Sequence, residues 1–154
     1  MKVLHALLFA FLTVGAAAAD DPYNESADAK LDIKQAFAEA ATTHTPVIIV
    51  FGANWCGDCK MLDSAMKSGA SAPLLSRDFK IVKVNVGRFD KNQDVAKSYG
   101  VPLGKGIPAV AIVSTRGEIL YVTKEGELAD ARKMGEDGIY EFFKKVTAAA
   151  KAKK

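Results

Sequence analysis

The sequence is poor in the residues that usually hold metals or staple small folds. Its 154 residues include two cysteines, two histidines and one tryptophan. A structural zinc site normally needs four protein ligands, and beside one pair of cysteines the chain offers only His5 and His44. This scarcity argues against structural zinc. A carrier of a soft metal, copper or zinc, that uses the two cysteines remains an alternative.

An excess of charge of one sign is also lacking. The 21 Lys and Arg residues are nearly balanced by 18 Asp and Glu residues, which leaves a formal net charge of +3. Nothing in this balance indicates binding to nucleic acid. Lysines gather near the C-terminus, where we expect a terminal helix and a solvated basic tail from about residue 150, at Lys144, Lys145, Lys151, Lys153 and Lys154.

The N-terminal apolar stretch is too short for an ordinary membrane span of about 20 residues. Lys2 precedes the mostly apolar residues 3–14, and four small residues follow at Ala16–Ala19. This pattern predicts a secretory signal peptide over residues 1–19, cleaved before Asp20; an uncleaved anchor is the alternative. Residues 20–154 then form one domain, which we expect to be a monomer.

The only two cysteines lie three residues apart in Trp55-Cys56-Gly57-Asp58-Cys59-Lys60, directly after the apolar run Val47–Phe51. If a strand turns into a helix here, Cys56 lies at the helix N-terminus and Cys59 one turn later on the same face. The unpaired N–H groups of a helix start favour a thiolate at Cys56, which makes this sulfur reactive. Cys59 is then the resolving thiol.

A purely structural role for this pair is weakly supported. A disulfide across two intervening residues closes a very small loop and stabilises the fold little. Export to an oxidising compartment lets disulfides persist, so one close pair in an exported chain indicates catalysis rather than a structural cross-link. A bacterial periplasm is the expected location.

Periodicity predicts the remaining elements. The expected order is helix, strand, helix, strand, helix, strand, strand, helix. A break is expected at Ser71–Pro73, and turn residues at Ser114–Gly117 predict a hairpin. The elements are expected at Ala27–Thr43, Val47–Phe51, Cys59–Gly69, Phe79–Val86, Lys91–Tyr99, Ala109–Val113, Ile119–Thr123 and Ile139–Val146.

This order, the Trp-Cys-Gly-x-Cys-Lys motif and Gly106-Ile107-Pro108 before the hairpin resemble the thioredoxin family. The resemblance runs from about Ala27 to Ala150. It implies an α/β thioredoxin-like fold, a central mixed sheet flanked by helices. It also implies that Ile107–Pro108 is a cis peptide that faces the disulfide and can hydrogen-bond an extended substrate; a trans proline at the start of an edge strand is the alternative.

The resemblance extends to the residues around the cysteines. Trp55 is expected beside the sulfurs as part of a docking surface, with a simple core or rim aromatic as the alternative. Gly57 and Lys60 match the motif, with Lys60 either stabilising a thiolate or solvated. Asp58 departs from the proline usual in thioredoxins, and its carboxylate is expected to oppose a thiolate or to be a solvated first-turn residue.

Two further departures bear on function. The buried aspartate that thioredoxins carry six residues before the first cysteine is replaced by Val50, so Lys83, which usually accompanies it, is expected to lack its partner. The segment Pro102–Lys105 is longer than the single residue usual there and is expected to help select a partner.

The expected function is thiol–disulfide exchange. Cys56 attacks a disulfide and Cys59 resolves the mixed disulfide, with no cofactor and no metal. The expected partners are disulfide-containing exported proteins and a membrane thiol reductant. Asp58 favours reduction, while oxidation and isomerisation use the same residues and remain alternatives, as does a binding module with an inert fold.

Overall fold

The computed structural model describes residues 21–152; the predicted signal peptide lies outside them. The chain forms a mixed sheet with helices on both faces, as expected. Its elements are α1 (Ala29–Thr43), β1 (Val47–Gly52), α2 (Gly57–Lys67), α3 (Ser71–Asp78), β2 (Lys80–Asn85), α4 (Gln93–Ser98), the 3₁₀ helix η1 (Leu103–Lys105), β3 (Ala109–Val113), β4 (Ile119–Val122) and α5 (Ala131–Ala152).

The four strands lie in the order β2-β1-β3-β4. β1 is parallel to β2, whereas β1 with β3 and β3 with β4 are antiparallel. The parallel pair is joined through α2 and α3, because a parallel connection needs a long crossover. The antiparallel β3 and β4 form the predicted hairpin, with the Ser114 N–H bonded to the Glu118 carbonyl oxygen at 2.8 Å.

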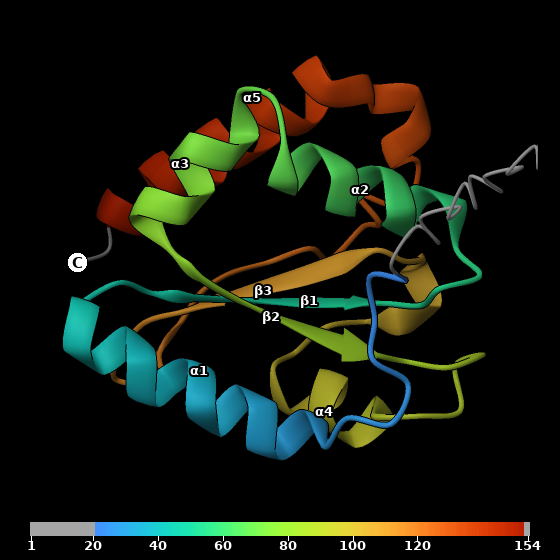
Figure 1. Ribbon diagram of the computed structural model, residues 1–154, viewed down its shortest axis with the longest axis horizontal. Coiled ribbons are helices and arrows are strands. Elements are labelled where there is room, and N and C mark those ends of the chain that lie inside the picture. Colours follow the sequence, from blue (N-terminus) through green and yellow to red (C-terminus); the bar gives the residue numbers. More distant parts are fainter. Residues whose placement is uncertain (1–20, 153–154) are drawn as a thin grey trace, which may run out of the picture.

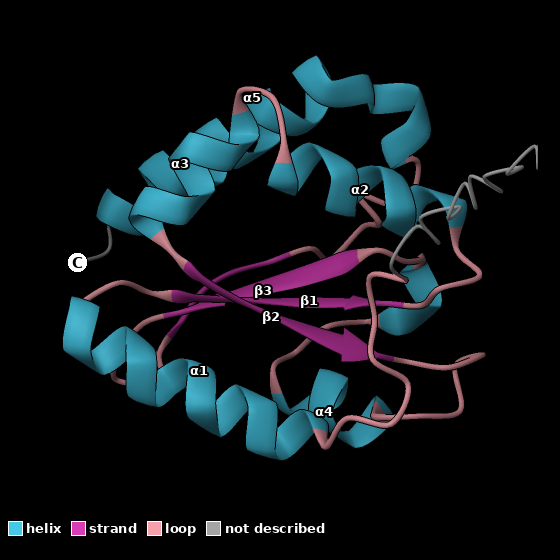
Figure 2. Ribbon diagram, viewed as in Figure 1, coloured by secondary structure: helices cyan, strands magenta, loops and turns pink. Residues whose placement is uncertain are grey.

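The helices cover the sheet in two layers. Figure 1 shows α2, α3 and α5 on one side of the sheet and α1 and α4 on the other. Figure 2 shows that the loops carrying the ends of β1 and β2 gather at one end of the sheet, next to the start of α2. None of the helices within residues 21–152 is long and apolar enough to cross a membrane.

β1 is the centre of the core, since all six of its residues are buried. Ile49 and Phe51 pack on the side of α1 and α4, whereas Ile48 and Val50 pack on the side of α2 and α5. A strand covered on both faces reads as a continuous apolar run, which explains why Val47–Phe51 does not alternate.

The break predicted at Ser71–Pro73 is wrong. These residues begin α3, an eight-residue helix that leads into β2. Pro73 lies in its first turn, where a backbone N–H has no partner within the helix, so a proline there costs no hydrogen bond. Gly69, at φ +63°, separates α3 from α2.

α5 closes the fold and extends further than expected. Gly135 interrupts its helical geometry near the start, at φ 65° and ψ −178°. Beyond it, Ile139, Phe143 and Val146 are buried, as the apolar spacing predicted. The tail predicted from about residue 150 is helical as far as Ala152, and Lys151 Nζ contacts the Asp78 carboxylate at 2.9 Å.

Candidate active site

Cys56 and Cys59 form a disulfide at the start of α2, with their Cα atoms 5.2 Å apart. Cys56 has an extended backbone and precedes the first helical residue, Gly57. The Cys59 N–H donates to Cys56 Sγ at 3.1 Å. A helix-start N–H is therefore directed at the sulfur that becomes a thiolate when the pair is reduced. The predicted placement of both cysteines is confirmed.

The two sulfurs differ in access. Cys56 is 6% exposed, whereas Cys59, in the first turn of α2, is fully buried. A disulfide in another molecule can therefore reach Cys56 first. Cys59 is placed to act on Cys56 from the interior side.

Ile107 faces the disulfide from the loop before β3. The Ile107–Pro108 peptide bond is cis, and the Ile107 carbonyl oxygen lies 3.6 Å from Cys56 Sγ. This oxygen can accept a hydrogen bond from a Cys56 thiol. Because it carries partial negative charge, it repels a Cys56 thiolate. The contact brings together segments 51 residues apart.

Asp58 is neither an isolated carboxylate beside the sulfurs nor a solvated first-turn residue, because it is paired with Arg132. Its Oδ1 accepts from the Arg132 N–H at 2.9 Å, and its Oδ2 accepts from the Arg132 guanidinium at 3.1 Å. The side chain is 15% exposed, and the hydrogen bond from Arg132 lowers the pKa of the carboxyl. Asp58 therefore caps the start of α5 from another helix, and Arg132 balances its charge.

Gly57 and Lys60 complete the α2 side of the motif. The Arg132 guanidinium carbon lies 3.2 Å from where a Cβ on Gly57 would stand, so this glycine leaves room for the arginine. The Lys60 ammonium, with 53% of its side chain exposed, lies 3.3 Å from an Asp21 carboxylate oxygen. Of the two predicted roles for Lys60, the structure favours the solvated one.

Trp55 lies on an exposed rim beside the disulfide. The side chain is 49% exposed, and its Nε1–H donates to the Gly87 carbonyl oxygen at 2.7 Å. Phe89 packs edge-on with ring centroids 6.0 Å apart, and the Arg88 guanidinium lies 5.7 Å from the indole centroid. We call Trp55, Arg88 and Phe89 the aromatic rim. The sequence indicated only Trp55, because Phe89 lies in a loop without periodicity.

Tyr23 is a further residue near the disulfide that the sequence analysis did not single out. It lies in the segment before α1 and is 3% exposed. A Cβ on Gly52 would overlap the Tyr23 hydroxyl and would stand 3.0 Å from Cys59 Sγ. The only available signal was the glycine that ends an otherwise bulky apolar strand, because such a glycine often marks a close approach.

Lys83 does have a carboxylate partner, contrary to the expectation. Val50 is buried and apolar, but the Lys83 ammonium is paired with Asp63 of α2, one turn after Cys59. Burial lowers the pKa of Lys83 despite this partner. The family pattern places the acid in β1, whereas here Asp63 of α2 supplies it.

The segment Pro102–Lys105 forms η1 and leads through Gly106 into Ile107. With α4 it lines an open cleft of about 510 Å³ whose lining residues include neither cysteine nor Ile107. Among residues 21–152 no three His, Cys, Asp or Glu side chains are grouped to hold a metal ion. Within this part of the chain, no third protein ligand of these types joins the two sulfurs.

Comparison with known proteins agrees with this geometry. The family model for thioredoxin matches residues 29–134. A thioredoxin from Pseudomonas aeruginosa is 33% identical over 94 residues, covering 56% of this chain and 71% of its own. A protein disulfide-isomerase from Ricinus communis is 28% identical over 144 residues. The chain spans about a quarter of that relative's length, 26%, although 93% of the chain is matched.

A solved structure is similar over nearly its whole length. The crystal structure of a disulphide isomerase from Xylella fastidiosa Temecula1 has 47% sequence identity and a TM-score of 0.81. The match covers 84% of this chain and 99% of that one. With the cysteine pair at the start of α2 and a family model that matches most of the chain, these similarities identify the chain as a member of the thioredoxin family.

Proposed function

We propose that the chain is a thiol–disulfide oxidoreductase that reduces disulfides of exported proteins through a Cys56/Cys59 dithiol–disulfide cycle. The observation that carries this proposal is the disulfide at the start of α2, with Cys56 6% exposed and Cys59 fully buried behind it. The similarity to a disulphide isomerase at 47% identity supports the same chemistry.

In the proposed cycle the Cys56 thiolate attacks one sulfur of a client disulfide. A Cys56–client bond forms, and the other client sulfur leaves with the electron pair and takes a proton. The Cys59 N–H and the start of α2 stabilise the attacking thiolate. Cys59 then attacks Cys56, forms the intramolecular disulfide and releases the second client sulfur as a thiol.

The reducing direction is favoured by what surrounds Cys56. A reductant holds its disulfide form stable, so its thiolate is not strongly stabilised. The Ile107 carbonyl oxygen, 3.6 Å from Cys56 Sγ, disfavours a thiolate there. Arg132 balances Asp58, so the carboxylate contributes less to this direction than the sequence indicated.

The proposed location is the exported compartment, a bacterial periplasm. The support is the N-terminal pattern of Lys2, an apolar stretch and Ala16–Ala19. Electrons would come from a membrane thiol reductant, because a cycle that reduces clients must itself be reduced by a dithiol. N-terminal sequencing of the exported protein is expected to begin at Asp20.

Trapping tests the mechanism. Cys59→Ala removes the resolving sulfur, so it is expected to accumulate mixed disulfides with clients that dithiothreitol releases. Cys56→Ala, the matched control, retains one thiol but is expected to trap none. Equal trapping by both variants, or client reduction by either, contradicts the proposed order of attack.

Isomerisation is the second candidate, favoured by the similarity to the Xylella fastidiosa protein. An isomerase needs the Cys56 thiolate, but a client thiol can release the mixed disulfide in place of Cys59. Refolding of a scrambled client separates the two activities. A reductase loses turnover in Cys59→Ala, whereas an isomerase keeps a substantial fraction.

A further inference from the structure

The segment before α1 is anchored to the active-site loop. Figure 1 shows it, in blue, crossing from the side of α2 to that of α1 at the ends of β1 and β2. The Tyr23 N–H donates to Asn54 Oδ1 at 2.9 Å, and Asn54 Nδ2 donates back to the Tyr23 carbonyl oxygen at 2.8 Å. Asn54 lies two residues before Cys56, so this pair of bonds fixes the backbone of Tyr23 relative to the disulfide.

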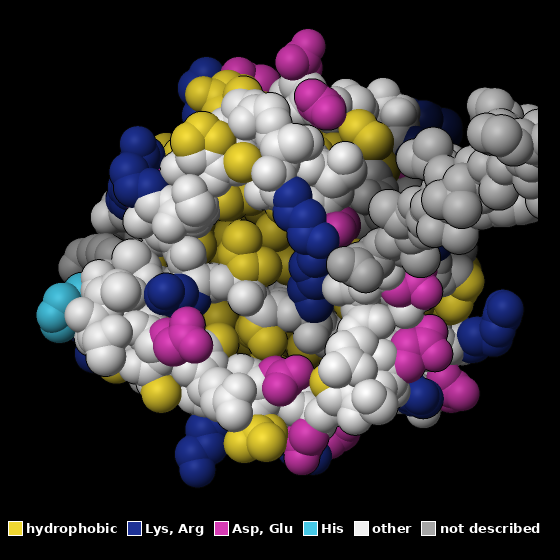
Figure 3. Space-filling view, in the orientation of Figure 1, with side chains coloured by type: hydrophobic (Ala, Val, Ile, Leu, Met, Phe, Trp, Pro, Cys, Tyr) yellow, Lys and Arg dark blue, Asp and Glu magenta, His cyan; other side chains and the backbone are white. Residues whose placement is uncertain are grey.

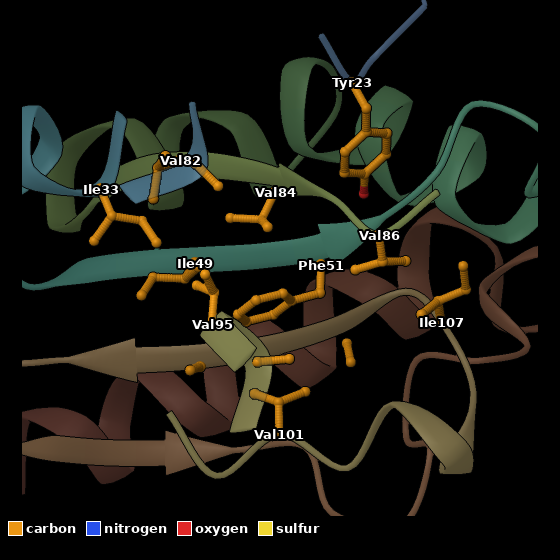
Figure 4. Packing of buried hydrophobic residues seen from close by; sticks show 14 of the residues in the cluster. Tyr23, Ile33, Ile49, Phe51, Val82, Val84, Val86, Val95, Val101 and Ile107 are labelled. Atoms are coloured by element: carbon orange, nitrogen blue, oxygen red, sulfur yellow. The ribbon is translucent and has the colours of Figure 1, made fainter. Parts of the chain in front are cut away.

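The Tyr23 side chain points inward from this anchor. Figure 4 shows its ring reaching into the core with the hydroxyl directed at the end of β1. At that end Gly52 carries no side chain, and the vacated position is bordered by the phenol and by Cys59 Sγ. A tyrosine hydroxyl and the buried sulfur of the cycle are therefore neighbours across Gly52.

The chemistry of the resolving step gives this placement a use. Cys59 must be a thiolate when it attacks Cys56, yet it is fully buried among apolar groups. A buried charge is costly unless a hydrogen-bond donor faces it. A phenol O–H is such a donor, and burial raises the pKa of Tyr23, which keeps the proton on oxygen.

We infer that Tyr23 is a positioning residue for the resolving step: its hydroxyl donates a hydrogen bond to the Cys59 thiolate once the disulfide is open. The thiolate then attacks Cys56 Sγ of the mixed disulfide. The Cys56–Cys59 bond forms, the Cys56–client bond breaks, and its electron pair leaves on the client sulfur, which is protonated by water. The client disulfide is the oxidant, and a dithiol donor restores the pair.

Titration of Cys59 tests this role directly. The two thiols of a reduced site titrate as a coupled pair, so Cys56→Ala is used to leave Cys59 as the only thiol. The Cβ chemical shift of ¹³C-labelled Cys59 is followed against pH, with Tyr23 and with Tyr23→Phe. The variant keeps the ring and removes only the hydroxyl, so we expect the midpoint to rise by about one pH unit.

Tyr99→Phe is the matched control. Tyr99 is a partly buried tyrosine at the end of α4, on the face of the sheet opposite α2. It packs against the same apolar cluster as Tyr23. It is expected to leave the Cys59 midpoint unchanged. Coincident midpoints for Tyr23→Phe and Tyr99→Phe overturn the inference, because a packing role alone does not move a titration.

A second test measures the lifetime of the mixed disulfide in a chain that keeps both cysteines. In the chain with Cys56 and Cys59 intact, Tyr23→Phe is expected to lengthen the life of the mixed disulfide at pH 7 about tenfold, and less at a pH where Cys59 is fully ionised. A change that is the same at every pH contradicts the inference.

Fluorinated tyrosine at position 23 covers the case in which Tyr23→Phe does not fold. It keeps the shape of the side chain and strengthens the O–H donor, so the Cys59 midpoint is expected to fall; an unshifted midpoint overturns the inference.

The inference rests on the proposed function, but the titration reads Cys59 itself. A chain that reduced no client would still give a midpoint, so the two failures are distinguishable.

Discussion

Asp58 and Arg132 join the active-site helix to the start of α5 across 74 residues of sequence, through two hydrogen bonds at 2.9 and 3.1 Å. The pair puts opposite charges beside the reactive disulfide, on a carboxylate that is mostly buried and a guanidinium that is mostly exposed. The charge that acts on Cys56 is therefore set by two residues from different helices.

Neutralising the two partners separately is expected to shift the reduction potential in opposite directions. Asp58→Asn leaves Arg132 unbalanced and favours the thiolate, so the potential becomes less negative. Arg132→Gln leaves Asp58 unbalanced and makes it more negative. Each shift should be about 30 mV or less, as a tenfold change in equilibrium is about 30 mV.

Equilibration with a glutathione buffer and thiol trapping measures both shifts. Arg116→Gln is the control, because Arg116 pairs with Glu118 in the β3–β4 hairpin, at 3.0 Å and away from the disulfide. Shifts of the same sign in Asp58→Asn and Arg132→Gln would show that Arg132 does not balance Asp58.

Gly52 is expected to tolerate no side chain. A Cβ there would overlap the Tyr23 hydroxyl and stand 2.5 Å from its ring carbon, so Gly52→Ala overpacks the core and should cost about 1–3 kcal/mol of the free energy of unfolding. Gly104→Ala is the matched control, since no heavy atom lies within 4 Å of the added Cβ. Urea unfolding at pH 7 compares them; equal midpoints would mean that Gly52 has room.

Asp78 is expected to make stability depend on acid pH. Hydrogen bonds from Arg77 and then Lys151 lower its pKa to about 2. Because the folded pKa lies below the unfolded value of about 3.9, the stabilisation is complete above that value and is lost as pH falls towards 2. It also ties the end of α3 to the last turn of α5.

Asp78→Asn should therefore destabilise the protein by about 1–2 kcal/mol at pH 7 and by much less near pH 2. Urea unfolding at several pH values measures the difference. Asp90→Asn, in the loop after β2, is the control. A penalty for Asp78→Asn that does not shrink in acid would rule out the ionised pair as its cause.

The aromatic rim is expected to matter for protein clients alone. Phe89 is 39% exposed and packs against Trp55, so it can contact a client that docks over Cys56. Phe89→Ala should lower kcat/KM for a protein disulfide about fivefold to tenfold and leave reduction of a small aliphatic disulfide unchanged. Leu31→Ala, at a 50% exposed position on α1, is the control. Equal losses on both substrates would place Phe89 in the chemistry.

The sequence predicted the sheet and the reactive pair because their signals are local. Val47–Phe51 is a continuous apolar run, and the two cysteines follow it directly. The sequence pattern does not predict α3, because Ser71–Pro73 indicates a break, although a proline is tolerated in a first helical turn.

The surroundings of the pair could not be predicted because they are set by distant segments. Arg132 reaches Asp58 from α5, and Asp63 takes the place beside Lys83 from a helix rather than from β1. Tyr23 comes from a polar segment without periodicity and is placed by its bonds to Asn54.

The equilibrium reduction potential of the Cys56–Cys59 pair tests the central claim most directly. It is measured on the mature chain in a thiol–disulfide buffer, with the fraction of free thiol read by alkylation. The proposed reductase is expected to lie near the reducing end of the family, at about −270 mV. A value near about −120 mV, where the strong oxidants of the family lie, would contradict the reducing direction and indicate a chain that inserts disulfides.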